Sequence, residues 1–430
     1  MLDLHFIREH PDVVREAIRN KHFQVDLDRL LDVDARYLAL VQEVEGIRSE
    51  RNRLSKAIPS ASKDDRPAMI AESKALGDKV GVLETQMGEL QIERDKLLLT
   101  IPNVPVADTP IGQGEHDNKV VRLWGEPRKF DFKPRDHIEL CKLHGLADLE
   151  RPTKFAGSRA YALTGFGVLL EQSLMRMALD LLSESGFTLV APPVLVREEA
   201  MVGTGFFPLG YDDTYRTENR AANATSLFLI GTSEVSLVSL HADEIFEPGT
   251  LPVRYAGISP CFRREAGAAG RDTAGLYRVH QFNKVEQVVF CEPDPEISLR
   301  EHLRLLGNSE TILQRLELPH RVALACTGEL GLGQVRKHEV ETWMPSRNAY
   351  AETHSCSTLH EFQARRSKIR VRLEAGGKPV HVHTLNNTAL ASPRILIPVL
   401  EHYQDEDGSI RIPKALQPYL GGRERLEAPR

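Results

Sequence analysis

Residues 262–286 read FRREAGAAGRDTAGLYRVHQFNKVE, two polar, strand-like runs joined by a small glycine-rich segment. Alternate residues of a β-strand share a face. One face of the second run therefore carries cations, a ring and a carboxylate: Arg278, His280, Phe282, Lys284 and Glu286. By the same rule, Arg263 and Glu265 share a face of the first run. An antiparallel hairpin would bring an arginine, a glutamate and an aromatic ring to one surface.

This combination of side chains suits a nucleotide. Arginine binds phosphate oxygens bidentately, an aromatic ring stacks on a purine, and a carboxylate accepts from an exocyclic amine or holds a metal. A solvated two-stranded ribbon with cross-strand ion pairs accounts for the alternation equally well. The sequence has no GxxxxGK[ST] motif, so any ATP is bound without a P-loop.

The composition excludes several classes of protein. The 430 residues suffice for two or three domains, and a net charge of -6 is not that of a generally basic nucleic-acid binder. The five cysteines form no CxxC pair, which favours reduced thiols over disulfides or a zinc knuckle. The sequence shows no signal peptide and no apolar stretch long enough to span a bilayer. We therefore expect a cytoplasmic protein without membrane contact.

Two heptad stripes dominate the first third of the chain. The first stripe runs through Leu30, Val33, Tyr37, Leu40, Val44, Ile47, Leu54 and Ile58. The second runs through Met69, Leu76, Val80, Leu83, Met87, Leu90, Leu97 and Ile101. Between them, PSASKDDRP has a proline at each end, which stops one helix and starts the next. The pattern predicts an antiparallel coiled-coil hairpin over about residues 27–101, within an N-terminal domain of residues 1–104.

The hairpin has two interpretations. A bare coiled coil is usually a dimerisation or spacer element. Near the turn, however, basic residues outnumber acidic ones, so this end of the rod could rest on a phosphate backbone. The candidate contacts are Arg51, Arg53, Lys56 and Arg66.

The composition of the chain changes after the hairpin. Residues 105–134 are rich in proline and polar residues and are predicted to be a linker. From residue 135 to 430, strand-like runs such as FTLVAPPVLV, TSLFLIGT, LPVRYAGISP, YRVHQFNKVEQVVF and HVHTLN follow one another with few helices between. This order favours an α+β fold, with a largely antiparallel sheet flanked by helices, over a parallel doubly wound sheet.

FRRE followed by RVHQFNKVE resembles the second signature motif of class II aminoacyl-tRNA synthetases, in the form carried by seryl-tRNA synthetases. The resemblance covers nearly the whole chain. MLDLHFIREHPDVVREAI and the hairpin resemble that family's N-terminal arm, and GFTLVAPPVLV resembles its first, dimer-interface motif. GTSEVSL, YAETHSCSTLHEFQARR and HTLNNTALASPRILIPVLEHYQ resemble the serine site, the metal and ATP segment and the third motif.

The resemblance implies a serine–tRNA ligase. Such an enzyme activates L-serine with ATP and Mg²⁺ to seryl-adenylate, then transfers the seryl group to the 3′ end of tRNA(Ser). It leaves open whether tRNA(Sec) is also served. Neither step needs a protein nucleophile, because alignment and charge neutralisation carry the chemistry. The resemblance also implies a homodimer.

The site residues follow from the same resemblance. Arg263 and Arg394 are the expected catalytic residues, and Glu352 and Ser355 the expected magnesium ligands. The expected serine-binding residues are Thr232, Ser233, Glu234, Arg263, Glu286 and Thr388. The expected ATP-binding residues are Arg263, Arg264, Glu265, Val279, Phe282, Glu352, Thr353, His354, Ser355 and Arg394.

Some of these residues have simpler interpretations or depart from the family pattern. Val279 could only pack inward, and Thr232 with Glu234 could only cap a helix. Thr353 and His354 depart from the family's EISS, and His354 could be a surface histidine. Thr388 replaces a serine but keeps the hydroxyl. Arg264 and Arg271 could contact the acceptor end of the tRNA or only be solvated.

Two alternative functions stay open. An enzyme of the same fold could load a carrier protein, although such relatives lack the long N-terminal arm. A catalytically silent paralogue should have lost residues that this chain retains: Arg263, Glu265, Glu352 and Arg394.

Overall fold

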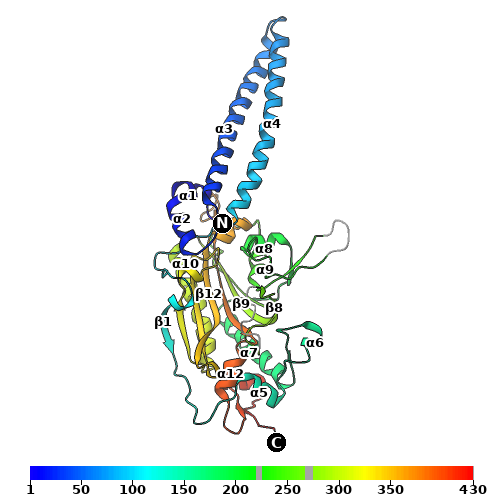
Figure 1. Cartoon of the computed structure of the whole chain (residues 1–430). Helices are drawn as coiled ribbons and strands as arrows, with labels where there is room; N and C mark the ends of the chain where they lie inside the picture. Colours follow the sequence, from blue (N-terminus) through cyan, green and yellow to red (C-terminus); the bar gives the residue numbers. More distant parts are fainter. Residues whose placement is uncertain (219–224, 267–274, 430) are drawn as a thin grey trace. The chain divides into compact units, whose positions relative to one another are not determined.

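The computed structural model describes residues 1–218, 225–266 and 275–429. The chain divides into two compact units, residues 2–102 and residues 103–430 together with Met1 (Figure 1). Arg271 lies outside the described residues. No helix among those described is long and apolar enough to cross a membrane.

The smaller unit is helical throughout. Its elements are α1 (Leu4–Glu9), α2 (Pro11–Asn20), α3 (Leu27–Ala57), η1 (Ile58–Ser60) and α4 (Arg66–Leu98). The Asp26 carboxylate accepts from the backbone N–H of Arg29 and so caps the start of α3. Pro67 stands in the first turn of α4, where its missing N–H costs no hydrogen bond. The predicted hairpin is confirmed: α3 and α4 run side by side as two long arms.

The heptad positions form the seam between the arms. Val44, Val80 and Leu83 make a buried cluster, against which Leu40 and Met87 pack. The second stripe has an arginine, Arg94, at the position between Leu90 and Leu97. The guanidinium carbon of Arg94 lies 4.2 Å from the centre of the Tyr37 ring, so the arginine covers the seam with a cation–π contact.

An eight-stranded sheet forms the centre of the larger unit. In spatial order it consists of β1 (Lys119–Trp124), β10 (His320–Leu324), β11 (Arg336–Met344), β12 (Ala349–His360), β15 (His383–Ser392), β9 (Gln281–Cys291), β8 (Val253–Phe262) and β4 (Thr188–Val190). Every neighbouring pair is antiparallel except β4 with β8. The predicted α+β class with an antiparallel sheet is therefore confirmed. Strand β1 lies within the segment predicted to be a linker, and it forms one edge of the sheet.

Helices cover one face of the sheet. Helices α7 (Phe166–Glu184) and α10 (Pro295–Arg315) contact β9 and β15, and α12 (Leu396–Tyr403) contacts β11 and α5 (His137–His144). Strand β9 divides its side chains between two cores. Val285 and Val289 belong to the core under α7 and α10, whereas Val288 and Phe290 pack with a second cluster beside α9 (Glu234–Ser239). The polar residues Lys284 and Glu286 alternate with the first pair, so they face away from α7 and α10.

Short elements complete the larger unit. The helices are α6 (Thr153–Ala156), α8 (Glu198–Thr204), α11 (Phe362–Ser367), η2 (Glu115–Asp117), η4 (Thr327–Glu329), η5 (Pro345–Arg347) and η6 (Lys414–Leu420). The strands are β2 (Ala147–Asp148), β3 (Ala162–Leu163), β5 (Leu195–Val196), β6 (Phe228–Leu229), β7 (Ile245–Phe246), β13 (Arg370–Val371), β14 (Val380–His381), β16 (Ile410–Arg411) and β17 (Arg425–Leu426).

The second polar run differs from its prediction at one end. Strand β9 begins only at Gln281, so Arg278 and His280 do not extend its face. Gly275 has a φ of +76°, and residues 276–280 have neither helical nor strand backbone. The side chain of Arg278 turns to Glu265, with Nη1 3.0 Å from Oε2.

Candidate active site

A cavity of about 230 Å³ opens where β9, β12 and the end of β15 meet. It collects residues that lie far apart in the sequence. Of the ten predicted ATP-binding residues, nine line this cavity: Arg263, Glu265, Val279, Phe282, Glu352, Thr353, His354, Ser355 and Arg394. Arg264 is not among the lining residues, and its backbone N–H donates to the carbonyl of Asp213 at 3.0 Å.

Two arginines point their charge at the cavity. The guanidinium carbon of Arg263 lies 5.2 Å from the centre of the Phe282 ring, and its Nε donates to Gly231 O at 3.3 Å. Arg394 donates from Nη1 to the carbonyl oxygen of Glu352 at 3.0 Å, and the same Nη1 is 3.5 Å from Glu352 Oε2. The cavity therefore offers a ring and two guanidinium groups, which suits a purine with its phosphates.

The backbone at Glu265 is unusual. Its φ is +55°, in the left-handed region that residues other than glycine rarely adopt. The ion pair with Arg278 holds its carboxylate at the cavity wall. A non-glycine residue in this conformation is typical of functional sites, where surrounding contacts maintain the strain.

Glu352 is the carboxylate best placed to share a cation with a phosphate group. Burial raises the pKa of this carboxyl, but the positive charges of Arg394, Lys337 and Arg263 outweigh burial and hold the pKa below its ordinary value. The described residues contain no cluster of three or more His, Cys, Asp or Glu that could hold a metal. Mg²⁺ commonly takes one or two carboxylates and completes its shell with substrate phosphates and water. Glu352 and Ser355, which line the same cavity, fit that arrangement.

His354 is not the surface histidine that its simpler interpretation implies. It is 1% exposed, and its Nδ1 lies 2.8 Å from the hydroxyl of Thr353, which in turn lies 2.7 Å from that of Thr342. Burial and then the neighbouring His320 lower the pKa of His354 to about 3. The ring therefore stays neutral beside Glu352 and contributes shape and hydrogen bonding to this wall.

A buried polar pocket adjoins the cavity on β9. Lys284 lines the cavity, is nearly fully buried, and donates to Thr232 Oγ1 at 2.8 Å. Its ammonium group also forms an ion pair with Glu286, whose carboxylate accepts from Thr388 Oγ1 at 3.3 Å. Three predicted serine-site residues are thus joined through one lysine. Lys284 was not predicted as a site residue, although it stands in the quoted NKVE.

Glu234 forms the second carboxylate of this pocket. Its Oε1 accepts from Gln363 Nε2 at 2.7 Å and from Asn386 Nδ2 at 2.8 Å. Burial, followed by the nearby Glu286 carboxylate, raises the pKa of Glu234 to about 7. Gln363 and Asn386 were not predicted, although they stand in the quoted YAETHSCSTLHEFQARR and HTLNNTALASPRILIPVLEHYQ; their contact with Glu234 appears only in the fold.

Thr232 and Ser233 precede α9 and take part in its start. Ser233 is the N-cap residue but makes no side-chain cap; its fully buried hydroxyl donates to Gly257 O at 3.4 Å. The Thr232 hydroxyl instead accepts from the backbone N–H of Glu234 at 3.3 Å. Thr232 therefore serves the helix start and the lysine at once, so the capping interpretation and the pocket coexist.

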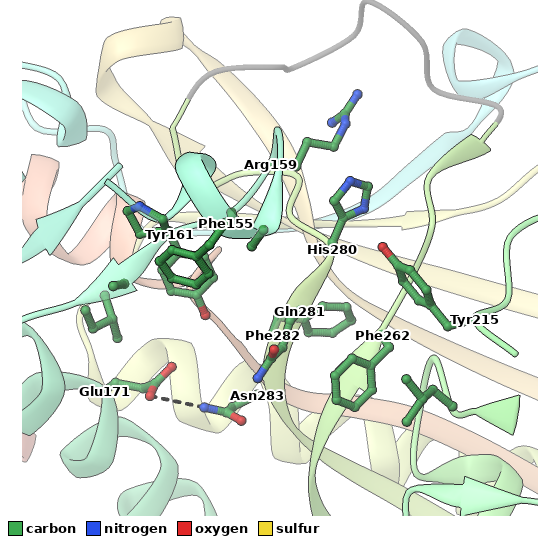
Figure 2. Close-up of a pocket in the computed structure, with 16 residues that line it drawn as sticks. Phe155, Arg159, Tyr161, Glu171, Tyr215, Phe262, His280, Gln281, Phe282 and Asn283 are labelled. Carbon is green, nitrogen blue, oxygen red and sulfur yellow. Dashed lines mark hydrogen bonds between the residues drawn. The ribbon is translucent and has the colours of Figure 1, made fainter. Parts of the chain in front are cut away.

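A second cavity of about 440 Å³ lies against Phe282 (Figure 2). Several aromatic side chains line it, among them Phe155, Tyr161 and Phe262. Glu171 and Asn283 lie at one end, where Asn283 Nδ2 donates to Glu171 Oε2 at 3.2 Å. None of the residues assigned only to serine, such as Glu286, lines this cavity.

The basic residues predicted near the hairpin turn are all exposed. Arg53 is paired with Glu50, at 2.6 Å between Nη2 and Oε1. Arg66 donates from Nη2 to Pro59 O at 3.1 Å. The Arg51 guanidinium lies over Gly77, where a Cβ would be 3.6 Å from Nη1. Lys56 extends from the last turn of α3.

Comparisons with known proteins cover the whole chain. Residues 1–105 match the family model of the seryl-tRNA synthetase N-terminal domain, and residues 215–403 match that of the tRNA synthetase class II core domain (G, H, P, S and T). The serine–tRNA ligase of Deinococcus radiodurans is 49% identical over 429 residues and 100% of both chains. That of Thermomicrobium roseum is 46% identical over 99% of this chain and 95% of its own.

Solved structures agree with the sequence relatives. The seryl-tRNA synthetase of Pyrococcus horikoshii, complexed with ATP, superposes with a TM-score of 0.93 at 36% identity over 100% of both chains. The cytoplasmic serine–tRNA ligase of Naegleria fowleri, in complex with AMP, gives a TM-score of 0.89 at 30% identity over 100% of this chain and 99% of its own. The two family models, the relatives that match over the whole chain and the solved structures lead to one conclusion: the chain belongs to the seryl-tRNA synthetase family of class II aminoacyl-tRNA synthetases.

Proposed function

We propose that this chain activates L-serine with ATP and transfers the seryl group to tRNA(Ser). The observation that carries the proposal is the junction of two sites. A cavity with two arginines and a carboxylate meets a buried pocket whose polar groups can bind an amino acid with a hydroxyl. The relatives named above as serine–tRNA ligases, and the neighbour complexed with ATP, support the same reaction.

In the first step a serine carboxylate oxygen bonds to the α-phosphorus of ATP, and the bond to the bridging oxygen of pyrophosphate breaks. Arg263 neutralises charge that develops on the α-phosphate, and Arg394 holds the γ-phosphate. Phe282 stacks on the adenine, and Glu265 accepts from its exocyclic amine. Aligned groups of this kind act on the transition state without reorganising. The serine carboxylate is itself the nucleophile, so no nucleophilic side chain is required.

Glu352 and Ser355 are the residues we assign to magnesium. When bound, Mg²⁺ would neutralise part of the charge on the triphosphate. The chain's own contribution is to keep the Glu352 carboxylate ionised, through the positive charges of Arg394, Lys337 and Arg263.

Serine is selected by buried polar groups. Thr232, Glu234, Glu286 and Thr388 lie in a pocket with little exposed surface. A substrate that lacks the hydroxyl would leave such groups unpaired, which costs far more than one missing methylene. We expect the extra methyl group of threonine to be excluded sterically.

In the second step the 3′-terminal ribose hydroxyl attacks the carbonyl carbon of seryl-adenylate, and AMP leaves. We assign this chemistry to residues 135–430 and the binding of the tRNA to residues 1–104, with 105–134 between them. The exposed basic residues near the turn, Arg51, Arg53, Lys56 and Arg66, contact its phosphates. Aminoacylation of tRNA(Sec) would require that the same residues also bind this second tRNA.

We further propose a cytoplasmic homodimer. The segment that resembles the dimer-interface motif carries two large apolar side chains, Leu189 and Leu195, that are 43% exposed in the single chain. An isologous interface across a two-fold axis would cover them. Sedimentation at micromolar concentration should give twice the 48.2 kDa chain mass; a monomer alone would contradict the dimer.

The direct test of the ligase activity is charging of tRNA. Purified full-length protein is mixed with ATP, Mg²⁺, labelled serine and total bacterial tRNA, and acid-precipitable label is counted. Serine should become attached to tRNA, and threonine or alanine at equal concentration should not. Serine-dependent consumption of ATP without label on the tRNA would favour a carrier-protein ligase instead.

A further inference from the structure

Residues 276–279 lie just before β9 and line the ATP cavity without belonging to a helix or strand. Leu276 is fully buried and Val279 nearly so. Backbone groups buried in this way need a hydrogen-bond partner. Since no strand ladder supplies one here, the position of the segment depends on individual contacts from neighbouring elements.

His137, at the start of α5, makes such a contact. Its Nε2 lies 3.2 Å from the backbone nitrogen of Leu276, and its Nδ1 lies 2.9 Å from Glu401 Oε1. A backbone N–H can only donate, so Nε2 is the acceptor and Nδ1 carries the ring hydrogen. The ring therefore accepts from Leu276 and donates to Glu401. A Cβ on Gly275 would come within 2.3 Å of Nε2, so only glycine allows this approach.

Glu401 is fully buried in α12 and collects donors from two directions. It accepts from the backbone N–H of His137 at 2.9 Å, and from the backbone N–H and hydroxyl of Ser346 at 2.9 and 2.8 Å. One carboxylate thus fixes both the histidine and the residue before Arg347. Because Glu401, His137 and Leu276 are buried, a partner lost by any of them would leave an unsatisfied polar atom.

The contacts of His137 and Glu401 lead to Tyr277 by two routes, one through Leu276 and the other through Ser346 and Arg347. The guanidinium carbon of Arg347 lies 4.0 Å from the centre of the Tyr277 ring, and that of Arg394 lies 4.4 Å from it. Arg394 Nε also donates to the Tyr277 carbonyl at 3.2 Å. The direction of Arg394 therefore depends on where Tyr277 is held.

We propose that His137 and Glu401 are a positioning pair that holds residues 276–279 and, through Tyr277, aims Arg394 at the γ-phosphate of ATP. This inference rests on the proposed function. Neither residue lines the ATP cavity, so the pair acts on ATP only through Tyr277 and Arg394. The serine pocket around Lys284 shares no hydrogen bond with the pair among the described residues.

The test compares two amides at position 137 in the full chain. The amide of asparagine overlays Nδ1 of a histidine and keeps the bond to Glu401, whereas the longer glutamine reaches the Nε2 position and keeps an acceptor for Leu276. In ATP–pyrophosphate exchange, H137N should lower kcat/KM for ATP about 10- to 100-fold through misplacement of Arg394. The KM for serine should not change, and H137Q should restore most of the loss.

Three results would overturn the proposal. Equal losses of kcat/KM for ATP in H137N and H137Q, or an equal rise of the KM values for ATP and serine, would show that the pair has only a structural role. Wild-type kinetics in H137N would show that it has no role in exchange. If H137N does not fold, E401Q is the second variant. It should show the same loss of kcat/KM for ATP, without a change of the KM for serine. Wild-type protein in the same experiment separates the two proposals. If it shows no serine-dependent exchange, the function is wrong; if it exchanges normally and the variants match it, only the positioning pair is wrong.

Discussion

Replacing Lys284 by methionine should destabilise the larger unit and abolish serine activation. Lys284 is 4% exposed, and its ammonium group forms an ion pair with Glu286, which is 2% exposed. Without the lysine, Glu286 keeps the hydroxyl of Thr388 at 3.3 Å as its described side-chain donor. Breaking a buried pair by removing one partner typically costs about 3–5 kcal/mol, because the remaining charge is uncompensated. Removing both charges in K284M/E286L should therefore recover most of that loss.

The unfolding assay can isolate the larger unit. The chain has two tryptophans, Trp124 and Trp343, and both lie there, so tryptophan fluorescence in urea reports this unit and not the hairpin. The matched control is R372M, which breaks the surface pair of Arg372 and Glu247 and should change the free energy of unfolding by less than about 1 kcal/mol. Two results would refute the buried-pair reasoning. One is a K284M protein whose free energy of unfolding lies within about 1 kcal/mol of wild type. The other is a double variant that loses as much stability as K284M and E286L lose together.

Three further predictions concern catalysis, pH and the hairpin. R263A should lower pyrophosphate exchange about 10²- to 10³-fold at unchanged urea midpoint, since one charge-stabilising group is lost; near-normal exchange would disprove the assignment. Because burial and Glu286 raise the folded-state pKa of Glu234 to about 7, above its unfolded value, its contribution to stability is full at low pH and is lost as pH rises to 7. Between pH 5 and 8, wild type should therefore lose up to roughly 3 kcal/mol relative to E234Q; parallel urea midpoints would contradict this. Replacing residues 30–100 with a short Gly/Ser linker should spare exchange and greatly weaken tRNA charging, and reversing the charges of Arg51, Arg53, Lys56 and Arg66 should flatten the salt dependence of tRNA binding; a folded deletion variant without exchange would place the hairpin in the active site.

Much of the fold could be predicted where one face of an element is apolar. The hairpin seam was visible because its apolar residues recur at heptad spacing, and strands such as β8 and β9 carry several β-branched or aromatic residues. The central strands β11 and β12 were not predicted. In β11, Glu339, Glu341 and Thr342 are all buried, so no alternation of polar and apolar residues marks the strand. Their partners come from other strands: Arg321 donates to Glu341 at 2.7 Å, and Thr342 meets Thr353.

The candidate site likewise contains residues that the sequence indicated and residues that only the structure revealed. Resemblance supplied nine of the residues that line the ATP cavity, because they stand in contiguous motifs. It did not supply Gln363 and Asn386, which donate to Glu234, or His137 and Glu401, which are 264 residues apart in the chain. These contacts exist only after the sheet and α12 have formed. Local pattern cannot indicate them, since each residue alone resembles an ordinary polar side chain.

The measurement that tests the account most directly is amino-acid-dependent ATP–pyrophosphate exchange by the full-length protein. Labelled pyrophosphate, ATP and Mg²⁺ are supplied with serine, threonine, alanine or cysteine in turn, and label in ATP is followed. Exchange that depends on serine, with the other three near background, is the predicted result. Equal exchange with several of these amino acids, or none with serine from a protein that remains folded, would contradict a serine-activating site built from Arg263, Arg394 and the Lys284–Glu286 pocket.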